Sequence, residues 1–81
     1  MSPLTLEQMR ADIAEVLQEP ADAIVAGENL LDLGLDSLRI MALAARWSRP
    51  DTPVEFADLA ELTELASWWA VVSRRQAGAA T

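Results

Sequence analysis

Apolar side chains recur at spacings of three and four residues in several segments of this 81-residue chain. Because an α-helix completes a turn in 3.6 residues, such spacing places these side chains on one face of a helix. No segment of useful length shows the strict alternation of a half-buried strand. The sequence therefore predicts an all-α fold. The length fits one small domain, which has room for a helical core but not for a deep, walled active-site pocket as well.

The first helix is predicted over residues 6–17. Thr5 followed by Gln8 has the form of a capping box, and Leu4 with Met9 has the spacing of a hydrophobic staple. These two features fix where the helix begins. Its apolar stripe consists of Leu6, Met9, Ile13, Val16 and Leu17.

The connection from Glu19 to Asp36 shows no sustained helical period. Pro20 marks the latest end of the preceding helix, and Gly27 and Gly34 interrupt the segment. A connection of this length is expected to pack on the core where it is apolar. The apolar residues concerned are Ile24, Val25, Leu30, Leu31, Leu33 and Leu35.

A second helix is predicted from Asp36, an N-cap residue, to about Ser48, before Pro50 and Pro53. One face carries a stripe wide enough to be buried, formed by Ile40, Leu43, Ala44 and Trp47. The opposite face is apolar too, with Leu38, Met41, Ala42 and Ala45. This helix should therefore leave a partly exposed apolar patch.

Two further helices complete the prediction. A short one covers residues 55–61, with Phe56 and Leu59 one turn apart. Thr63 is expected to cap a last helix that ends near Arg74, whose core stripe is Leu65, Trp68, Trp69 and Val72. The chain then divides into a tail over residues 1–4, a domain over residues 5–75 and a disordered tail over residues 76–81.

The composition excludes several classes of function. The chain has no cysteine and no histidine, so it lacks a thiolate nucleophile, the commonest proton shuttle and the usual metal ligands. We expect neither catalysis nor a metal site. Thirteen acidic residues against six arginines give a net charge of −7, which disfavours nucleic acid and anionic membranes. With no membrane span and no secretory signal, a cytoplasmic monomer is expected.

The run from Asp32 to Leu38 places Ser37 in the first turn of the second helix, directly after a glycine-containing loop. The free N–H groups and the positive dipole end of a helix N-terminus favour an attached phosphate. No histidine or lysine could activate this serine, so it would be the substrate of another enzyme. The alternative is an ordinary helix start in which Asp36 and Ser37 have no chemical role.

Leu33-Gly34-Leu35-Asp36-Ser37-Leu38 resembles the attachment motif of acyl, peptidyl and aryl carrier proteins. The resemblance extends over residues 5 to 75 and includes Glu28-Asn29-Leu30 in the loop. It implies a four-helix bundle with three longer helices and a short third one. It also implies that Ser37 receives 4′-phosphopantetheine from coenzyme A through a phosphopantetheinyl transferase, with Asp36 as helix cap and candidate recognition residue. The arm would supply the thiol that the sequence lacks.

Four segments indicate a subclass within this family, namely residues 34–37, 39–47, 56–60 and 68–69. They are similar to the aryl carrier domains of siderophore-type nonribosomal peptide assembly, which are often fused to isochorismatases. Fatty-acid carriers typically have acidic residues along the helix after the serine, whereas this helix has Arg39 and Arg46. The chain begins at Met1 with no isochorismatase before the motif, so it is either a free-standing carrier or an excised domain.

The resemblance implies a non-catalytic carrier that holds an aryl acid as a thioester for antibiotic or siderophore biosynthesis. A stand-alone adenylation enzyme would load it, and a condensation enzyme would unload it. We expect partner enzymes to contact Leu38, Met41, Phe56 and Ala60, although Met41 and Phe56 could instead pack against each other. A polyketide or amino-acyl carrier and an unmodified helical interaction module stay open as alternatives, and a hydrolase is a remote one.

Overall fold

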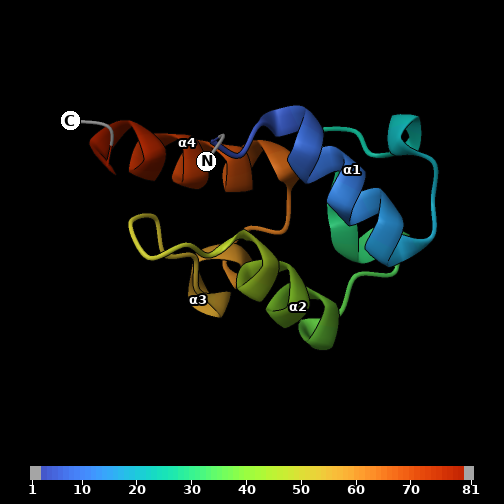
Figure 1. Cartoon of the computed structure of the whole chain (residues 1–81). Helices are drawn as coiled ribbons and strands as arrows, with labels where there is room; N and C mark the ends of the chain where they lie inside the picture. The colour runs from blue at the N-terminus through green and yellow to red at the C-terminus, as the bar shows by residue number, and fades with distance from the viewer. Residues whose placement is uncertain (1–2, 80–81) are drawn as a thin grey trace.

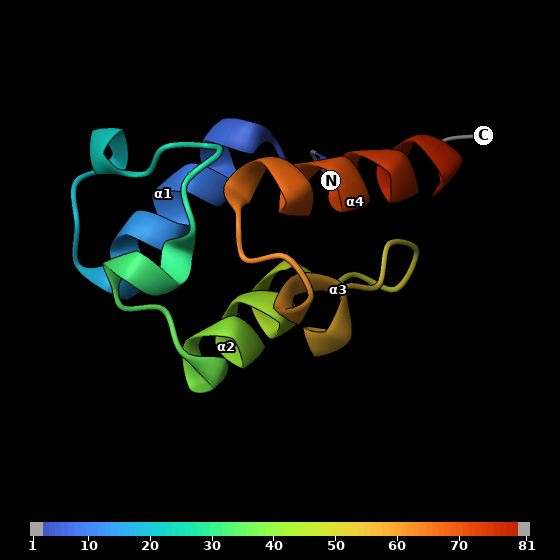
Figure 2. The ribbon, with the colours of Figure 1, turned by 180° about the vertical axis from the view of Figure 1, so that it is seen from behind.

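The computed structural model describes residues 3–79, which form four α-helices and two short 3-10 helices without a named strand. Figures 1 and 2 show α1 and α4 on one side of the bundle, with α2 and α3 on the other. The elements in chain order are α1 (Leu6–Leu17), η1 (Ala21–Ala23), η2 (Leu30–Leu33), α2 (Ser37–Trp47), α3 (Phe56–Ala60) and α4 (Leu65–Ala79). The predicted four-helix architecture, with a short third helix, is confirmed.

Helix α1 begins where its capping pattern predicts. The Thr5 hydroxyl oxygen accepts the N–H of Gln8 at 3.0 Å, and Leu4 and Met9 are both buried. The Gln8 amide does not return to Thr5 as in a complete capping box. It donates to the Asp12 carboxylate at 2.9 Å, so an exposed glutamine bonds a buried acid of the same helix. The helix ends at Gln18, which adopts a left-handed conformation.

The connection between α1 and α2 packs on the core only in part. Ile24, Leu30 and Leu35 are buried. Val25 and Leu31 are 54% and 50% exposed, so the prediction that they contribute to the core is wrong. Leu31 lies in η2 beside the buried Leu30, and Val25 follows η1 beside the buried Ile24, so exposed and buried side chains alternate there.

Helices α2 and α3 pack against each other and bury the predicted residues. All four residues of the stripe on α2 are buried, namely Ile40, Leu43, Ala44 and Trp47. Leu59 of α3 is fully buried, while Phe56 at the start of α3 is 39% exposed. The predicted outward residues of α2 are exposed as well.

Helix α4 differs from the prediction at both ends. It begins at Leu65, and the Thr63 hydroxyl donates to Asn29 Oδ1 at 2.6 Å instead of capping the helix. It continues through Ala79, so residues 76–79 are helical rather than disordered. Gln76 bonds both the N–H and the carbonyl of Leu4, at 2.6 and 2.9 Å, which ties α4 to the start of the chain. Residues 1–2 and 80–81 of the expected tails lie outside the described residues.

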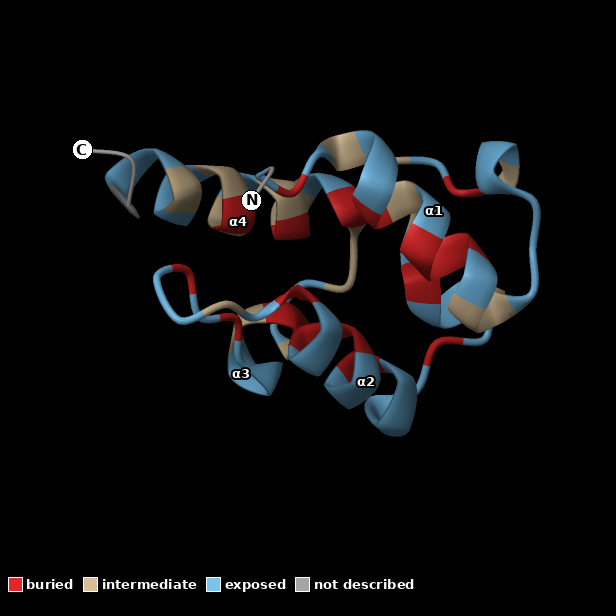
Figure 3. Cartoon of the chain, in the orientation of Figure 1, coloured by how far each residue is buried: buried red, intermediate tan, exposed pale blue. Residues whose placement is uncertain are grey.

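The core lies between α1, α2 and α4, where the buried residues of Figure 3 face one another. Trp47 of α2 and Trp68 of α4 meet edge to face, with ring centroids 5.7 Å apart. Leu65, Trp68 and Val72 of the predicted stripe on α4 are buried, and Trp69 is partly buried. No helix within residues 3–79 is long and apolar enough to cross a membrane.

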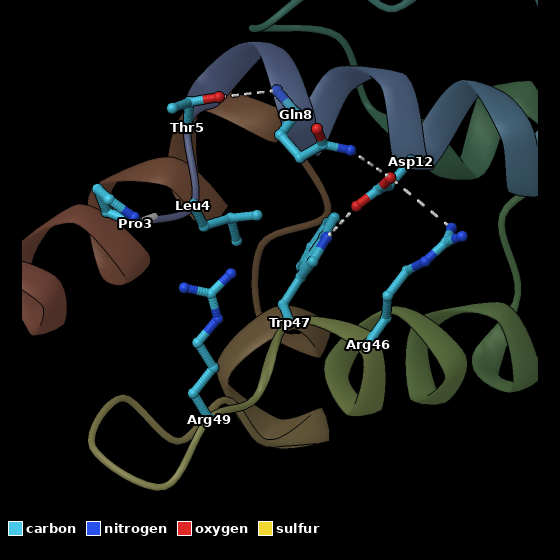
Figure 4. A pocket seen from close by; sticks show the side chains of 8 residues that line it. All are labelled: Pro3, Leu4, Thr5, Gln8, Asp12, Arg46, Trp47 and Arg49. Carbon is cyan, nitrogen blue, oxygen red and sulfur yellow. Dashed lines mark hydrogen bonds and ion pairs between the residues drawn. The ribbon is translucent and has the colours of Figure 1, made fainter. Parts of the chain in front are cut away.

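Beside the core, the start of α1 and the end of α2 border an open groove, shown in Figure 4. Its lining includes Leu4, Gln8 and Asp12 on one side and Arg46, Trp47 and Arg49 on the other. Trp47 and Arg46 belong to the last turn of α2, whereas Ser37 is its first residue. The groove is therefore separated from the predicted attachment serine by the length of the helix.

Candidate functional site

Ser37 is the first residue of α2, and its side chain is exposed. The N-cap is Asp36, whose backbone is extended and whose Oδ1 atom accepts the N–H of Arg39 at 2.9 Å. This bond satisfies one of the N–H groups that a helix start leaves without a backbone partner. The structure thus places Ser37 at the helix start that the sequence predicts.

The turn before Ser37 depends on Gly34, whose φ of +104° is a conformation that other residues rarely adopt. The N–H of Gly34 closes η2 by bonding to the carbonyls of Leu30 and Leu31. Leu35 is buried, and its N–H also bonds to the Leu30 carbonyl, at 3.2 Å. The backbone that leads to Ser37 is therefore held on the core, while Ser37 itself faces solvent.

The hydroxyl of Ser37 differs from those of the other described serines. Ser48 accepts the N–H of Val54, Ser67 donates to Glu64, and Ser73 donates to the Ala70 carbonyl. Within residues 3–79, the Ser37 hydroxyl has no hydrogen-bond partner. It is thus exposed, at a defined position, and free to be modified.

The surroundings of Ser37 fit a phosphodiester attached to its oxygen. In the described part of the chain, the first two N–H groups of α2, those of Ser37 and Leu38, have no partner. Free N–H groups and the positive end of the helix dipole favour a negative group at this place. The site has no base that could make Ser37 a nucleophile, since the sequence has no histidine or lysine.

Apolar side chains are exposed on the same helix and on α3. Leu38 is 75% exposed, Met41 49% and Phe56 39%, so Met41 and Phe56 do not bury each other. Ala60, on the same side of α3 as Phe56, is partly buried. Leu62, which follows α3, is 59% exposed and was not singled out from the sequence, because an isolated leucine in a loop shows no periodicity.

Helix α3 is held at its first turn by an ion pair to α4. Arg75 donates to both carboxylate oxygens of Asp58, at 2.6 and 2.8 Å, and to the carbonyl of Pro53 at 2.8 Å. Asp58 Oδ2 also accepts the N–H of Glu55 at 2.8 Å. The hydrogen bond from Arg75 is the main cause that lowers the pKa of Asp58 below its ordinary value. This contact, which the sequence did not predict, fixes the helix that presents Phe56.

Comparisons with known proteins agree with this geometry. The family model for the phosphopantetheine attachment site matches residues 7–71. The acyl carrier protein ScoB of Streptomyces coeruleorubidus is 47% identical over 78 residues, which are 96% of this chain and 92% of ScoB. No solved structure matches the chain.

Two larger proteins contain a similar segment. Phenyloxazoline synthase MbtB of Mycolicibacterium paratuberculosis is 43% identical over 72 residues, which are 89% of this chain and 6% of that protein. The isochorismatase of Bacillus subtilis is 44% identical over 71 residues, which are 88% of this chain and 23% of that protein. This chain therefore spans nearly all of ScoB but only a small part of these two relatives.

The chain belongs to the family of phosphopantetheine attachment domains. It is a phosphopantetheine carrier protein of the acyl and peptidyl carrier family, similar to carriers of siderophore-type nonribosomal peptide synthesis. Members of this family bind 4′-phosphopantetheine covalently and are generally not catalytic.

Proposed function

We propose that Ser37 carries the 4′-phosphopantetheine arm and that the chain delivers an aryl acid between enzymes of a nonribosomal peptide pathway. The observation that carries the assignment of Ser37 is its free hydroxyl at the exposed start of α2, after the turn at Gly34. The other described serines use their hydroxyls within the chain. The matched family segment also includes this position.

The residues around Ser37 have separate roles in this proposal. Asp36 caps α2 and keeps the first turn in place, and the free N–H groups of the helix start favour the phosphodiester. When bound, the arm supplies a thiol on which an acyl group can be held as a thioester. The chain itself has no cysteine. Chemical activation of the acid is left to partner enzymes.

An aryl cargo is supported by the similarity to phenyloxazoline synthase MbtB, whose name refers to a phenyl-substituted ring. The second candidate is an acyl cargo without an aryl ring, since ScoB, which this chain matches over almost its whole length, is named only as an acyl carrier protein. Loading assays with a stand-alone adenylating enzyme and a panel of acids distinguish these candidates. Loading of aryl acids alone supports the aryl proposal, and loading of aliphatic acids alone contradicts it.

We also propose that partner enzymes contact the docking face, defined here as Leu38, Met41, Phe56 and Ala60. Three of these four side chains are more than one third exposed. They leave an apolar surface beside the start of α2 that water does not favour. A carrier has to leave each enzyme again, which suits a few apolar anchors better than a large interface.

The cytoplasmic location expected from the sequence stays a prediction.

The attachment site is tested with coenzyme A, a broad-specificity phosphopantetheinyl transferase and intact-mass measurement. The native chain should gain the mass of one arm, and Ser37→Ala should gain none. Ser73→Ala is the matched control, because it removes a hydroxyl that bonds only within α4. Labelling of Ser37→Ala, or no labelling of the native chain, would contradict the assignment.

A further inference from the structure

Arg39 makes two contacts with the segment that presents Ser37. Its Nη1 atom lies 3.0 Å from Asp36 Oδ2 and 3.4 Å from the carbonyl oxygen of Gly34. The N–H of the same residue bonds to Asp36 Oδ1 at 2.9 Å. One residue therefore holds both oxygens of the N-cap carboxylate and the carbonyl of the preceding turn.

We propose that Arg39 is a positioning residue for the modification of Ser37. Its guanidinium joins the N-cap to the turn at Gly34, and this fixes the backbone on both sides of Leu35, whose side chain is buried. Ser37 follows directly, and within residues 3–79 its side chain makes no hydrogen bond or ion pair. Its orientation toward an incoming enzyme therefore depends on the residues that hold positions 34–36. This inference rests on the proposed attachment at Ser37.

The charge of Arg39 adds a second effect. A phosphodiester on Ser37 would place a negative charge next to Asp36, and like charges at this distance repel. The guanidinium paired with Asp36 offsets that repulsion. The side chains of Arg39 and Asp36 are 47% and 54% exposed, so solvent screens the pair and its effect should be modest.

Another arginine of α2 provides a control for charge. Arg46 lies in the last turn and bonds to Glu15 at 3.2 Å, also as an exposed pair. Arg46→Gln removes the same charge from the same helix and breaks the exposed pair with Glu15, together with a longer approach of 3.8 Å to the buried Asp12. It leaves the contacts of residues 34–37 intact. A difference in labelling rate between Arg39→Gln and Arg46→Gln is therefore due to the position of the arginine and not to the net charge of the chain.

The first measurement is the initial rate at which the transferase attaches the arm. Intact mass reports the labelled fraction, and the concentration of the carrier is varied. Arg39→Gln should lower kcat/KM by about three- to five-fold, in line with the loss of an exposed ion pair. Arg39→Lys, which keeps the charge but loses the planar fork, should recover part of the loss. Arg46→Gln should label at the native rate. Equal rates for Arg39→Gln and the native chain would overturn the inference.

Two further measurements distinguish positioning from direct contact with the transferase. In the isolated carrier, Arg39→Gln should shift the amide resonances of residues 34–37 and speed hydrogen exchange at the N–H of residue 39. In a double-mutant cycle, Arg39→Gln should add little to the loss caused by Asp36→Asn, because Arg39 acts through Asp36. Fully multiplicative losses with unchanged amide resonances would show that Arg39 contacts the enzyme instead. If the native chain is not labelled, the proposed attachment at Ser37 fails. If the native chain and Arg39→Gln are labelled at equal rates, only the role of Arg39 fails.

Discussion

The indole N–H of Trp47 donates to Asp12 Oδ2 at 2.8 Å, and this bond joins α2 to α1 inside the protein (Figure 4). Asp12 is buried, and its other oxygen accepts the Gln8 amide at 2.9 Å. Arg46 approaches the same oxygen at 3.8 Å. A buried carboxylate is costly unless it is paired and hydrogen-bonded, and these contacts meet that requirement. Trp47 therefore contributes both apolar area and a hydrogen bond.

Replacement of Trp47 should be among the most destabilising changes in the chain. Trp47→Ala removes a fully packed ring, including its edge-to-face contact with Trp68, and should cost about 3–5 kcal/mol. For a domain of this size the loss approaches the whole free energy of unfolding. Urea unfolding followed by circular dichroism measures it. Trp47→Phe keeps a ring but removes the indole N–H that donates to Asp12 Oδ2, so an intermediate loss is expected. No loss in either variant would mean that the ring is not in the core.

Much of the fold could be predicted because the relevant forces are local. The apolar stripes of α1 and α2 follow from a 3.6-residue period, and the caps at Thr5 and Asp36 depend on residues three positions apart. Interactions between distant positions could not be predicted in this way. The local sequence assigns no partner to Asp12, and only the packing of α2 against α1 brings the Trp47 indole to it.

The errors have the same physical origin. Threonine is a common helix cap, but the Thr63 hydroxyl bonds to Asn29, which is 34 positions away. Small residues near the end of the chain indicated disorder, yet Gln76 and Arg75 make contacts with Leu4 and Asp58 that support a longer α4. Ser37 could be singled out from the sequence because its motif is continuous, and its modification stays a prediction. The role of Arg39 could not be read there, since it requires the distances to Gly34 and Asp36.

Two glycines give a matched test of backbone strain at the site. Gly34 has a φ of +104°, whereas Gly27 has no such conformation, and a methyl group added at either position meets nothing within 4 Å. Gly34→Ala should therefore cost about 1–2 kcal/mol from strain alone. Gly27→Ala should be neutral or slightly stabilising, because it reduces the freedom of the unfolded chain. Thermal unfolding of both variants measures the contrast. Equal stability would show that the turn before Ser37 does not need its left-handed glycine.

The ion pair between Asp58 and Arg75 should make the stability of the protein depend on pH in the acidic range. The pKa of Asp58 is lowered in the folded protein from its ordinary 3.8, mainly by the hydrogen bond from Arg75. A lowered pKa means that the stabilisation is complete well above pH 3.8 and is lost as the pH falls through the folded-state value. Asp58→Asn should thus destabilise the protein by about 1 kcal/mol at pH 7, and the difference should shrink toward pH 3.

The measurement for this pair is urea unfolding of the native chain and Asp58→Asn at several pH values. Glu61→Gln provides the control, because Glu61 is exposed and has no ion pair in the described part of the chain. Its effect should be small at every pH. If the difference in free energy of unfolding between the native protein and Asp58→Asn stays constant from pH 7 to pH 3, the ionised carboxylate is not the source of the stabilisation.

The docking face gives a prediction about transfer rather than stability. Met41→Asp and Phe56→Asp each place a charge on an exposed apolar side chain, so folding and arm attachment should be largely unchanged. Ala60→Asp should follow the same pattern, with more cost to folding because Ala60 is partly buried. The rate at which the loaded carrier hands its acyl group to a condensation enzyme should fall. Met41 should be sensitive because it lies one turn beyond Ser37 and because Met adapts to different partner surfaces.

The control for this series is Ala11→Asp, which places the same charge on an exposed position of α1, outside the docking face. It should transfer its cargo at the native rate. Far-ultraviolet circular dichroism and the rate of arm attachment separate loss of docking from loss of fold. If the three variants on the docking face transfer at the native rate, or if they unfold, enzymes do not use this surface. A loss confined to Phe56→Asp would place the contact on α3 alone, which Arg75 holds in position through Asp58.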